Sequence, residues 1–201
     1  MPGREEQEED EVTPAEDLMR EHGVLKRVLL VYDEVRARIA DGKPFPAEAV
    51  TRSAQVIRSF IERYHEKLEE EQLFPRFRKK GKLVELVDTL QGQHLAGRRL
   101  TDEILARAGS GLKADADRQG LATALRLFGR MYAPHEARED TVLFPAIREI
   151  VSRQEYDALG EEFERKEHEL LGADGFEGAV ERVASVEKDL GIYDLGQFTP
   201  K

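Results

Sequence analysis

Apolar residues recur every three or four positions along most of the chain, which is the pattern of helices that bury one face. The pattern breaks at stretches rich in Gly, Pro, Lys or Asp, such as "DGKPFP" at residues 41–46 and "GSGLKADADRQG" at residues 109–120. Strand-like alternation of apolar and polar residues is not sustained in the sequence. We therefore predict an all-α protein, with helices over residues 14–40, 47–79, 83–108, 121–150, 152–171 and 177–190.

Local signals mark several helix ends. Thr13, Pro14 and Glu16 form a capping box with proline at the first helical position. The "SRQE" that begins at Ser152 is a second capping box and opens the fifth helix. Prolines inside the second and fourth helical patterns predict kinks or interruptions, at Pro75, Pro134 and Pro145.

The chain also repeats a mixed polar and apolar stretch. "HEKLEEEQLFPRF" begins at His65 and "HEAREDTVLFPAI" begins at His135, 70 residues later. A lone histidine precedes each stretch, His22 before the first and His94 before the second. The sequence therefore indicates two helical hairpins, each with one His on its first helix and His-x-x-x-Glu on its second. Two such hairpins pack as an up-down-up-down four-helix bundle.

These patterns divide the chain into three parts. We expect an acidic disordered tail over residues 1–13, the four-helix bundle over residues 14–150, and a C-terminal helical extension over residues 151–201 that packs on the bundle. The fold prediction is thus a four-helix bundle with additional C-terminal helices.

Composition narrows the function. The chain has 41 acidic against 31 basic residues, a net charge of -10, and its basic residues cluster only as pairs on helix surfaces, so we expect no nucleic-acid partner. No apolar run approaches the ~20 residues of a membrane span. The acidic N-terminus lacks the segments of a secretory signal, so a cytoplasmic location is expected. Cysteine is absent, so any metal ligands must be nitrogen or oxygen.

Four histidines and two glutamates share the apolar stripes of the four long helices and therefore face the bundle interior: His22, His65, Glu69, His94, His135 and Glu139. An ionised carboxylate in an apolar seam is costly unless it is paired or coordinated. No Lys or Arg lies on these stripes near the two glutamates. A cation would neutralise them, and the i, i+4 spacing puts each His and Glu on one helix face.

Six such ligands are more than one tetrahedral zinc can use. Two ions about 3.5–4 Å apart that share carboxylates can use all six. Mixed imidazole and carboxylate ligation with positions left open favours two iron ions, with manganese and then zinc as alternatives.

Residues 15–150 resemble the hemerythrin-like family, the His-His-Glu cation-binding four-helix bundles, through the order and register of these histidines and glutamates. The resemblance implies a non-haem di-iron centre in which Glu69 and Glu139 bridge the irons beside an oxo, hydroxo or water bridge. Two positions depart from the oxygen-carrying members. Arg98 stands where they have a second histidine, which argues against simple reversible oxygen carriage. Asp140 stands at the offset of their aspartate, but Glu139 repeats Glu69 and is the preferred ligand.

Some residues keep two interpretations. The fifth histidine, His168, is either a surface residue or a further ligand that the added helix brings to the open iron, with Glu164 or Glu167. Glu66 and its counterpart Glu136 are each turned ~100° from a ligand. They are expected as solvated or supporting carboxylates, with ligation by Glu66 as the alternative. Arg98 is either a packed arginine or a hydrogen-bond donor to a bound peroxide.

The first functional hypothesis is a di-iron protein that reacts with small oxidants (O2, H2O2 or NO) and acts as a peroxidase or catalase. The second is an oxygen or iron sensor, or an iron store, that binds without turnover and reports to an unidentified protein partner. A metal-free helical adaptor is the third, and it would have to explain two buried glutamates without partners.

Overall fold

The computed structural model describes residues 12–172 and 175–200, and every regular element in these residues is a helix. The predicted all-α fold is confirmed. Its elements are α1 (Pro14–Ala40), α2 (Ala47–Val56), η1 (Ile57–His65), α3 (Glu66–Leu68), η2 (Glu69–Leu73), α4 (Phe74–Lys80), α5 (Val84–Gly109), α6 (Asp115–Arg138), η3 (Glu139–Leu143), α7 (Ile147–Ile150), α8 (Arg153–Leu171), α9 (Gly175–Leu190) and η5 (Leu195–Phe198). The first three η segments are π-helical and η5 is a 3₁₀ helix.

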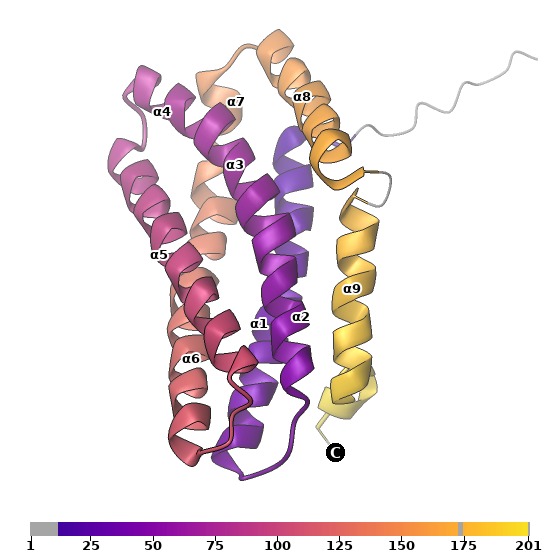
Figure 1. The fold of residues 1–201 in the computed structure, drawn as a ribbon. Coiled ribbons are helices and arrows are strands. Elements are labelled where there is room, and N and C mark those ends of the chain that lie inside the picture. The colour runs from indigo at the N-terminus through magenta and orange to yellow at the C-terminus, as the bar shows by residue number, and fades with distance from the viewer. Residues whose placement is uncertain (1–11, 173–174, 201) are drawn as a thin grey trace, which may run out of the picture.

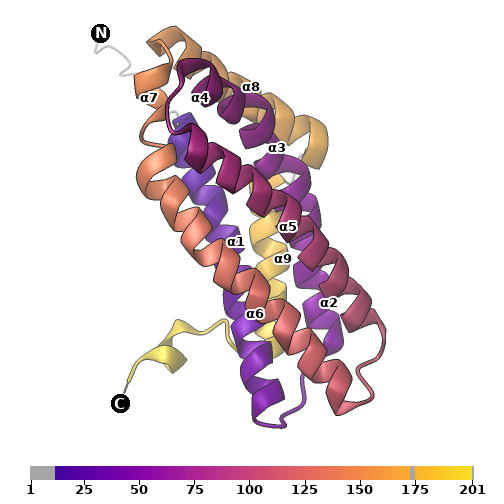
Figure 2. The ribbon, with the colours of Figure 1, turned by 90° about the vertical axis from the view of Figure 1, so that its left-hand side faces the viewer.

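Four rods form an up-down-up-down bundle, as predicted. They are α1, the continuous run from α2 to α4, α5, and α6 with η3 (Figures 1 and 2). Each rod contacts two neighbours: α1 contacts α2, α2 contacts α5, α5 contacts α6, and α6 contacts α1. Each rod therefore turns one face to a shared core, in which apolar side chains such as Val28, Phe60, Ile104 and Phe128 are fully buried.

The predicted helix starts reflect local hydrogen bonds. At α1, the Glu16 backbone N–H donates to the Thr13 hydroxyl and the Thr13 N–H donates to the Glu16 carboxylate. Ser152 caps α8 in the same way. α6 begins at Asp115, six residues before the predicted Leu121, because the acidic residues of "KADAD" suit the positive end of a helix. α9 likewise begins slightly earlier than predicted.

The two Leu-Phe-Pro stretches each follow a π-helical turn. η2 begins at Glu69 and η3 begins at Glu139, and in each the N–H of the residue five positions later donates to the glutamate carbonyl. A proline ring clashes with the carbonyl four residues earlier, and a wider π turn makes room for it. The helix continues past Pro75 as α4, whereas residues 144–146 around Pro145 form a turn. Pro134 stays inside α6.

The C-terminal helices α8 and α9 pack on the bundle. α8 contacts α1, η1 and α7, and α9 lies along α1 and α2 (Figure 1). Residues 1–11 of the predicted acidic tail lie outside the described residues. None of the helices in the described ranges combines the length and apolarity needed to cross a bilayer.

Candidate metal centre

Six of the seven predicted ligands meet in the middle of the bundle core. Their side chains are at most 4% exposed, although all six are polar: His22 on α1, His65 at the end of η1, Glu69 at the start of η2, His94 on α5, His135 on α6 and Glu139 at the start of η3. Helical periodicity thus placed each residue on the correct face, and the bundle brought the four faces together.

The four imidazoles form two pairs, one from each hairpin. In the first pair, the ring centroids of His22 and His65 lie 4.7 Å apart and their Nε2 atoms 3.0 Å apart. In the second pair, the ring centroids of His94 and His135 lie 5.1 Å apart. Each pair could hold one cation.

The two glutamates lie between the pairs. The Glu139 carboxylate is 3.1 Å from His135 Nε2 and 3.4 Å from His22 Nε2. The Glu69 carboxylate is 3.3 Å from His94 Nε2 and 3.8 Å from His65 Nε2. Each carboxylate therefore faces one histidine of each pair.

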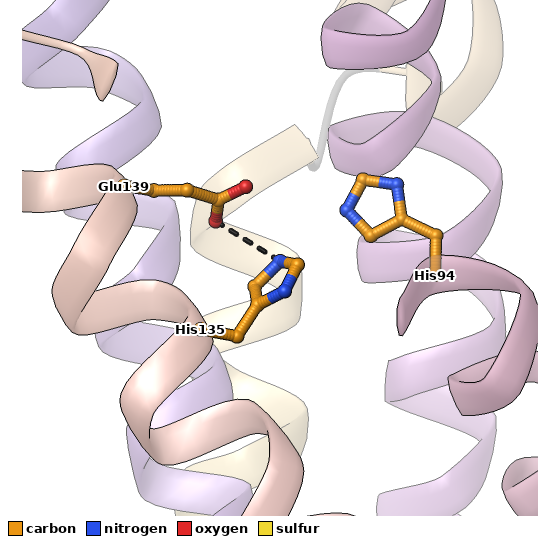
Figure 3. A group of neighbouring side chains, drawn as sticks. All are labelled: His94, His135 and Glu139. Carbon is orange, nitrogen blue, oxygen red and sulfur yellow. Dashed lines mark ion pairs between the residues drawn. The ribbon is translucent and has the colours of Figure 1, made fainter. Parts of the chain in front are cut away.

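Figure 3 shows half of this cluster, in which Glu139 and the two rings of the second pair converge from α5, α6 and η3. One ligand atom from each of His94, His135 and Glu139 lies within 4.8 Å of the others. A small shift of side chains would let these three atoms share one ion.

All four imidazoles use their outward nitrogen in a hydrogen bond. Nδ1 donates to an oxygen of a neighbouring side chain in four pairs: His22 to Asp140 (2.7 Å), His65 to Glu21 (2.6 Å), His94 to Glu70 (3.1 Å) and His135 to Gln93 (2.8 Å). A proton fixed at Nδ1 leaves the Nε2 lone pair free for a cation, and such partners also orient the ring.

The buried oxygens test whether a cation fits. Within the described residues, neither carboxylate oxygen of Glu69 or Glu139 has a hydrogen-bond partner, and nor does His94 Nε2. A buried polar atom without a partner is costly. Since these atoms converge on one small volume, a metal cation fits the residues present.

The protonation of the two glutamates reflects the same crowding. Burial and the negative charge of Glu139 raise the pKa of Glu69 to about 7. Burial acts against ionisation of Glu139 too, but the nearby His135 and His22 rings lower its pKa. Two carboxylates in one dry volume thus compete for the positive charge that cations would supply.

Neighbouring carboxylates raise the pKa of two histidines, which favours an extra proton on each when no cation is bound. Burial lowers the pKa of His22, but the hydrogen bond to Asp140 and the nearby Glu139 carboxylate outweigh it and raise the pKa to about 10. The neighbouring carboxylates of Glu69 and Glu70 raise the pKa of His94 to about 10 in the same way. A cation must displace these protons, so binding strengthens as pH rises.

Two of the carboxylates that hold a histidine are themselves paired with a basic residue, which lies one helical turn after that histidine. Lys26 Nζ lies 3.1 Å from Asp140, four residues after His22. Arg98 Nη2 lies 2.6 Å from Glu70, four residues after His94. Asp140 therefore supports a histidine from outside, while Glu139 faces the cluster.

Glu66 is buried, so of the two roles expected for it, solvated or supporting, the structure favours the supporting one. Its carboxylate accepts from the Tyr132 hydroxyl at 2.7 Å and from Arg98 at 2.8 Å. Arg98 thus packs between two carboxylates. Glu136 is buried as well, and burial raises its pKa to about 7. Glu66, Glu70 and His94 also form a close group of potential ligands, but the Arg98 guanidinium already neutralises these carboxylates.

The phenylalanines of the repeated Leu-Phe-Pro cover the centre on one side. The Phe74 ring stacks on His94 at 5.5 Å, and the Phe144 ring stacks on His22 at 5.4 Å. Each ring covers a histidine of the other hairpin. The repeat therefore supplies apolar walls as well as ligands.

The structure does not bring His168 to the cluster. Its side chain is exposed on α8, whereas the other six are buried. α8 buries Tyr156, Leu159 and Phe163, and a residue five positions after Phe163 points well away from that face. Glu167 instead accepts from the Phe176 N–H at 2.6 Å. The expectation of a seventh ligand from α8 is therefore corrected.

Sequence reasoning missed Glu21 and Gln93 as hydrogen-bond partners of the cluster. Both directly precede the lone histidine of their hairpin, and both hold the histidine of the following helix. Their identical position in the two hairpins was the available signal.

The fold and the site define a four-helix bundle whose buried His and Glu side chains could hold metal cations. The model of the Hemerythrin HHE cation binding domain matches residues 13–147, so the chain belongs to this family. Three mycobacterial proteins are each 49% identical over 195 residues, which is 96% of this chain and 76% of each relative. They are "Uncharacterized protein Rv1995" and "Uncharacterized protein MT2051" of Mycobacterium tuberculosis and "Uncharacterized protein Mb2018" of Mycobacterium bovis. No solved structure matches the chain.

Proposed function

We propose that this chain is a non-haem di-iron protein that reacts with small oxidants, namely O2, H2O2 or NO. The observation that carries the proposal is the position of Glu69 and Glu139, each of which faces one histidine from each pair. Each ion would receive two imidazoles and a share of two carboxylates. Iron suits mixed nitrogen and oxygen ligands with open positions better than manganese or zinc does.

The protein side chains have three separate tasks in this proposal. The outward partners hold a proton at Nδ1 of each histidine and keep Nε2 directed inward. Phe74 and Phe144 exclude water from one side of the centre. When bound, two ferrous ions supply two electrons, the number that reduces H2O2 to water. Arg98 donates to the Glu66 and Glu70 carboxylates, and Glu70 in turn holds His94, so Arg98 would support the centre without contacting the metal.

This activity would protect a cell against oxidants, and we propose a cytoplasmic location for it. The cysteine-free chain is compatible with a reducing compartment.

Iron binding is tested by metal analysis of protein produced with iron. We expect about two irons per chain, as two bridging carboxylates imply. The double variant His65→Ala, His135→Ala lacks one ligand from each pair and should bind no iron. The matched control is His168→Ala, which removes an exposed histidine and should keep both irons. Full loading of the double variant, with a helical circular dichroism spectrum, would refute the site.

The burial of all six side chains favours a second candidate, a sensor or store that reacts once with an oxidant. Oxygen evolution after addition of H2O2 separates the two. Release of many O2 molecules per iron supports a catalase, whereas one stoichiometric oxidation supports the sensor or store. Persistence of an unchanged ferrous spectrum under excess H2O2 and O2 would contradict both.

A further inference from the structure

The two hairpins build the centre with near-equivalent residues. His94 corresponds to His22, His135 to His65 and Glu139 to Glu69. The outward partners correspond too, since Glu70 holds His94 as Asp140 holds His22. The two halves therefore present almost the same donors.

One pair of outward partners breaks the equivalence. The Glu21 carboxylate accepts from His65 Nδ1 at 2.6 Å, whereas the neutral Gln93 amide oxygen accepts from His135 Nδ1 at 2.8 Å. Glu21 is fully buried, whereas Gln93 is partly exposed. Three imidazoles thus have an acidic partner and His135 has an amide.

This difference acts on the donor strength of the imidazole. A carboxylate that accepts the Nδ1–H pushes electron density onto the ring and makes Nε2 a better ligand, and a neutral amide does so less.

From this asymmetry we infer that the two cation positions are unequal and that Gln93 sets the difference. The His22–His65 position fills first. The His94–His135 position fills last, releases its cation first, and is therefore the exchangeable one. The inference rests on the proposed two-cation centre and not on its reaction with oxidants. Outer partners of metal-bound histidines typically change affinity by about 10- to 100-fold, so a ranking of about 10-fold is expected.

The order of filling can be read by NMR of the imidazole nitrogens. Cation-free protein labelled with ¹⁵N at histidine is titrated with Zn²⁺, which keeps the resonances sharp. The first equivalent should shift His22 and His65, and the second should shift His94 and His135. The exposed His168 serves as an internal reference, because it should not respond to either equivalent.

Exchanging the outward partners provides matched variants. Gln93→Glu gives both hairpins an acid, and Glu21→Gln gives both an amide, so in each the two positions should fill together. The double exchange, with both substitutions in one chain, should reverse the order. Gln93→Glu is at a partly exposed position and is therefore the variant least at risk of misfolding.

Each outcome has a defined meaning. Simultaneous or reversed filling in the parent protein overturns the ranking, and so does an unchanged order in folded Gln93→Glu. Uptake of two Zn²⁺ in the wrong order leaves the proposed function intact. A parent protein that takes up fewer than two Zn²⁺ at these histidines would contradict the two-cation centre itself.

Discussion

Gly97 on α5 is the position where one added methyl group should disturb the centre most directly. A Cβ at this residue would lie 1.9 Å from the Tyr132 hydroxyl oxygen and 2.7 and 2.8 Å from two ring carbons. Tyr132 has little freedom to move away. Its ring packs against Phe128 and His135, and its hydroxyl donates to Glu66 at 2.7 Å. Glycine at this position therefore makes room for the tyrosine.

The cost of Gly97→Ala follows from these contacts. Forcing extra volume into a packed core costs about 1–3 kcal/mol. Breaking the buried hydrogen bond from Tyr132 to the Glu66 carboxylate costs a further ~1–3 kcal/mol. The better helix propensity of alanine returns about 1 kcal/mol. We therefore expect a net loss of about 1–5 kcal/mol in the free energy of unfolding.

Urea unfolding followed by far-UV circular dichroism measures this loss. The control is Gly92→Ala, on the same helix, where an added Cβ meets nothing within 4 Å. That variant should be stabilised by up to about 1 kcal/mol through helix propensity alone. Equal unfolding free energies for the two variants would refute the reasoning. Gly97→Ala should also weaken Zn²⁺ binding at His135, because Tyr132 packs on that ring.

Three further predictions concern single substitutions. Glu139→Gln should abolish binding of the second cation. Asp140→Asn should weaken cation binding by only about 10- to 100-fold, because Asp140 orients His22 and does not face the cluster. Equal losses for the two variants in a Zn²⁺ titration would contradict the choice of Glu139 over Asp140 as the ligand. Burial and the nearby acid Glu21 raise the pKa of Asp17 from 3.8 to about 7. The contribution of Asp17 to the free energy of unfolding is therefore fully present below pH 4, and it is lost as the pH rises through 7. Asp17→Asn should therefore gain about 1–3 kcal/mol over the parent in urea unfolding at pH 8 and nothing at pH 4, and a gain that is independent of pH would be inconsistent with this cause. His168→Ala should leave iron content and the optical spectrum unchanged, and a changed spectrum would restore this residue to the centre.

The structure also separates residues that could be placed from the sequence from those that could not. Glu139 and Asp140 are neighbours in the chain, and the repeat with Glu69 was enough to choose the one that faces the core. His168 was undecided, because the angle at which α8 packs on α1 determines where its border residues point. Glu66 was expected as a solvated or a supporting carboxylate, and only the packing of Tyr132 and Arg98 from two other helices decided for the supporting role.

The sequence alone determined the helices, the capping boxes at Thr13 and Ser152, and the His-x-x-x-Glu spacing, because all of these depend on residues within a turn or two of one another. Only the tertiary structure decided which oxygen holds each imidazole. Asp140 reaches His22 and Glu70 reaches His94 across different helices, so these pairs exist only once the rods have packed. Helical periodicity specifies the face that a side chain occupies, and packing specifies what that face meets.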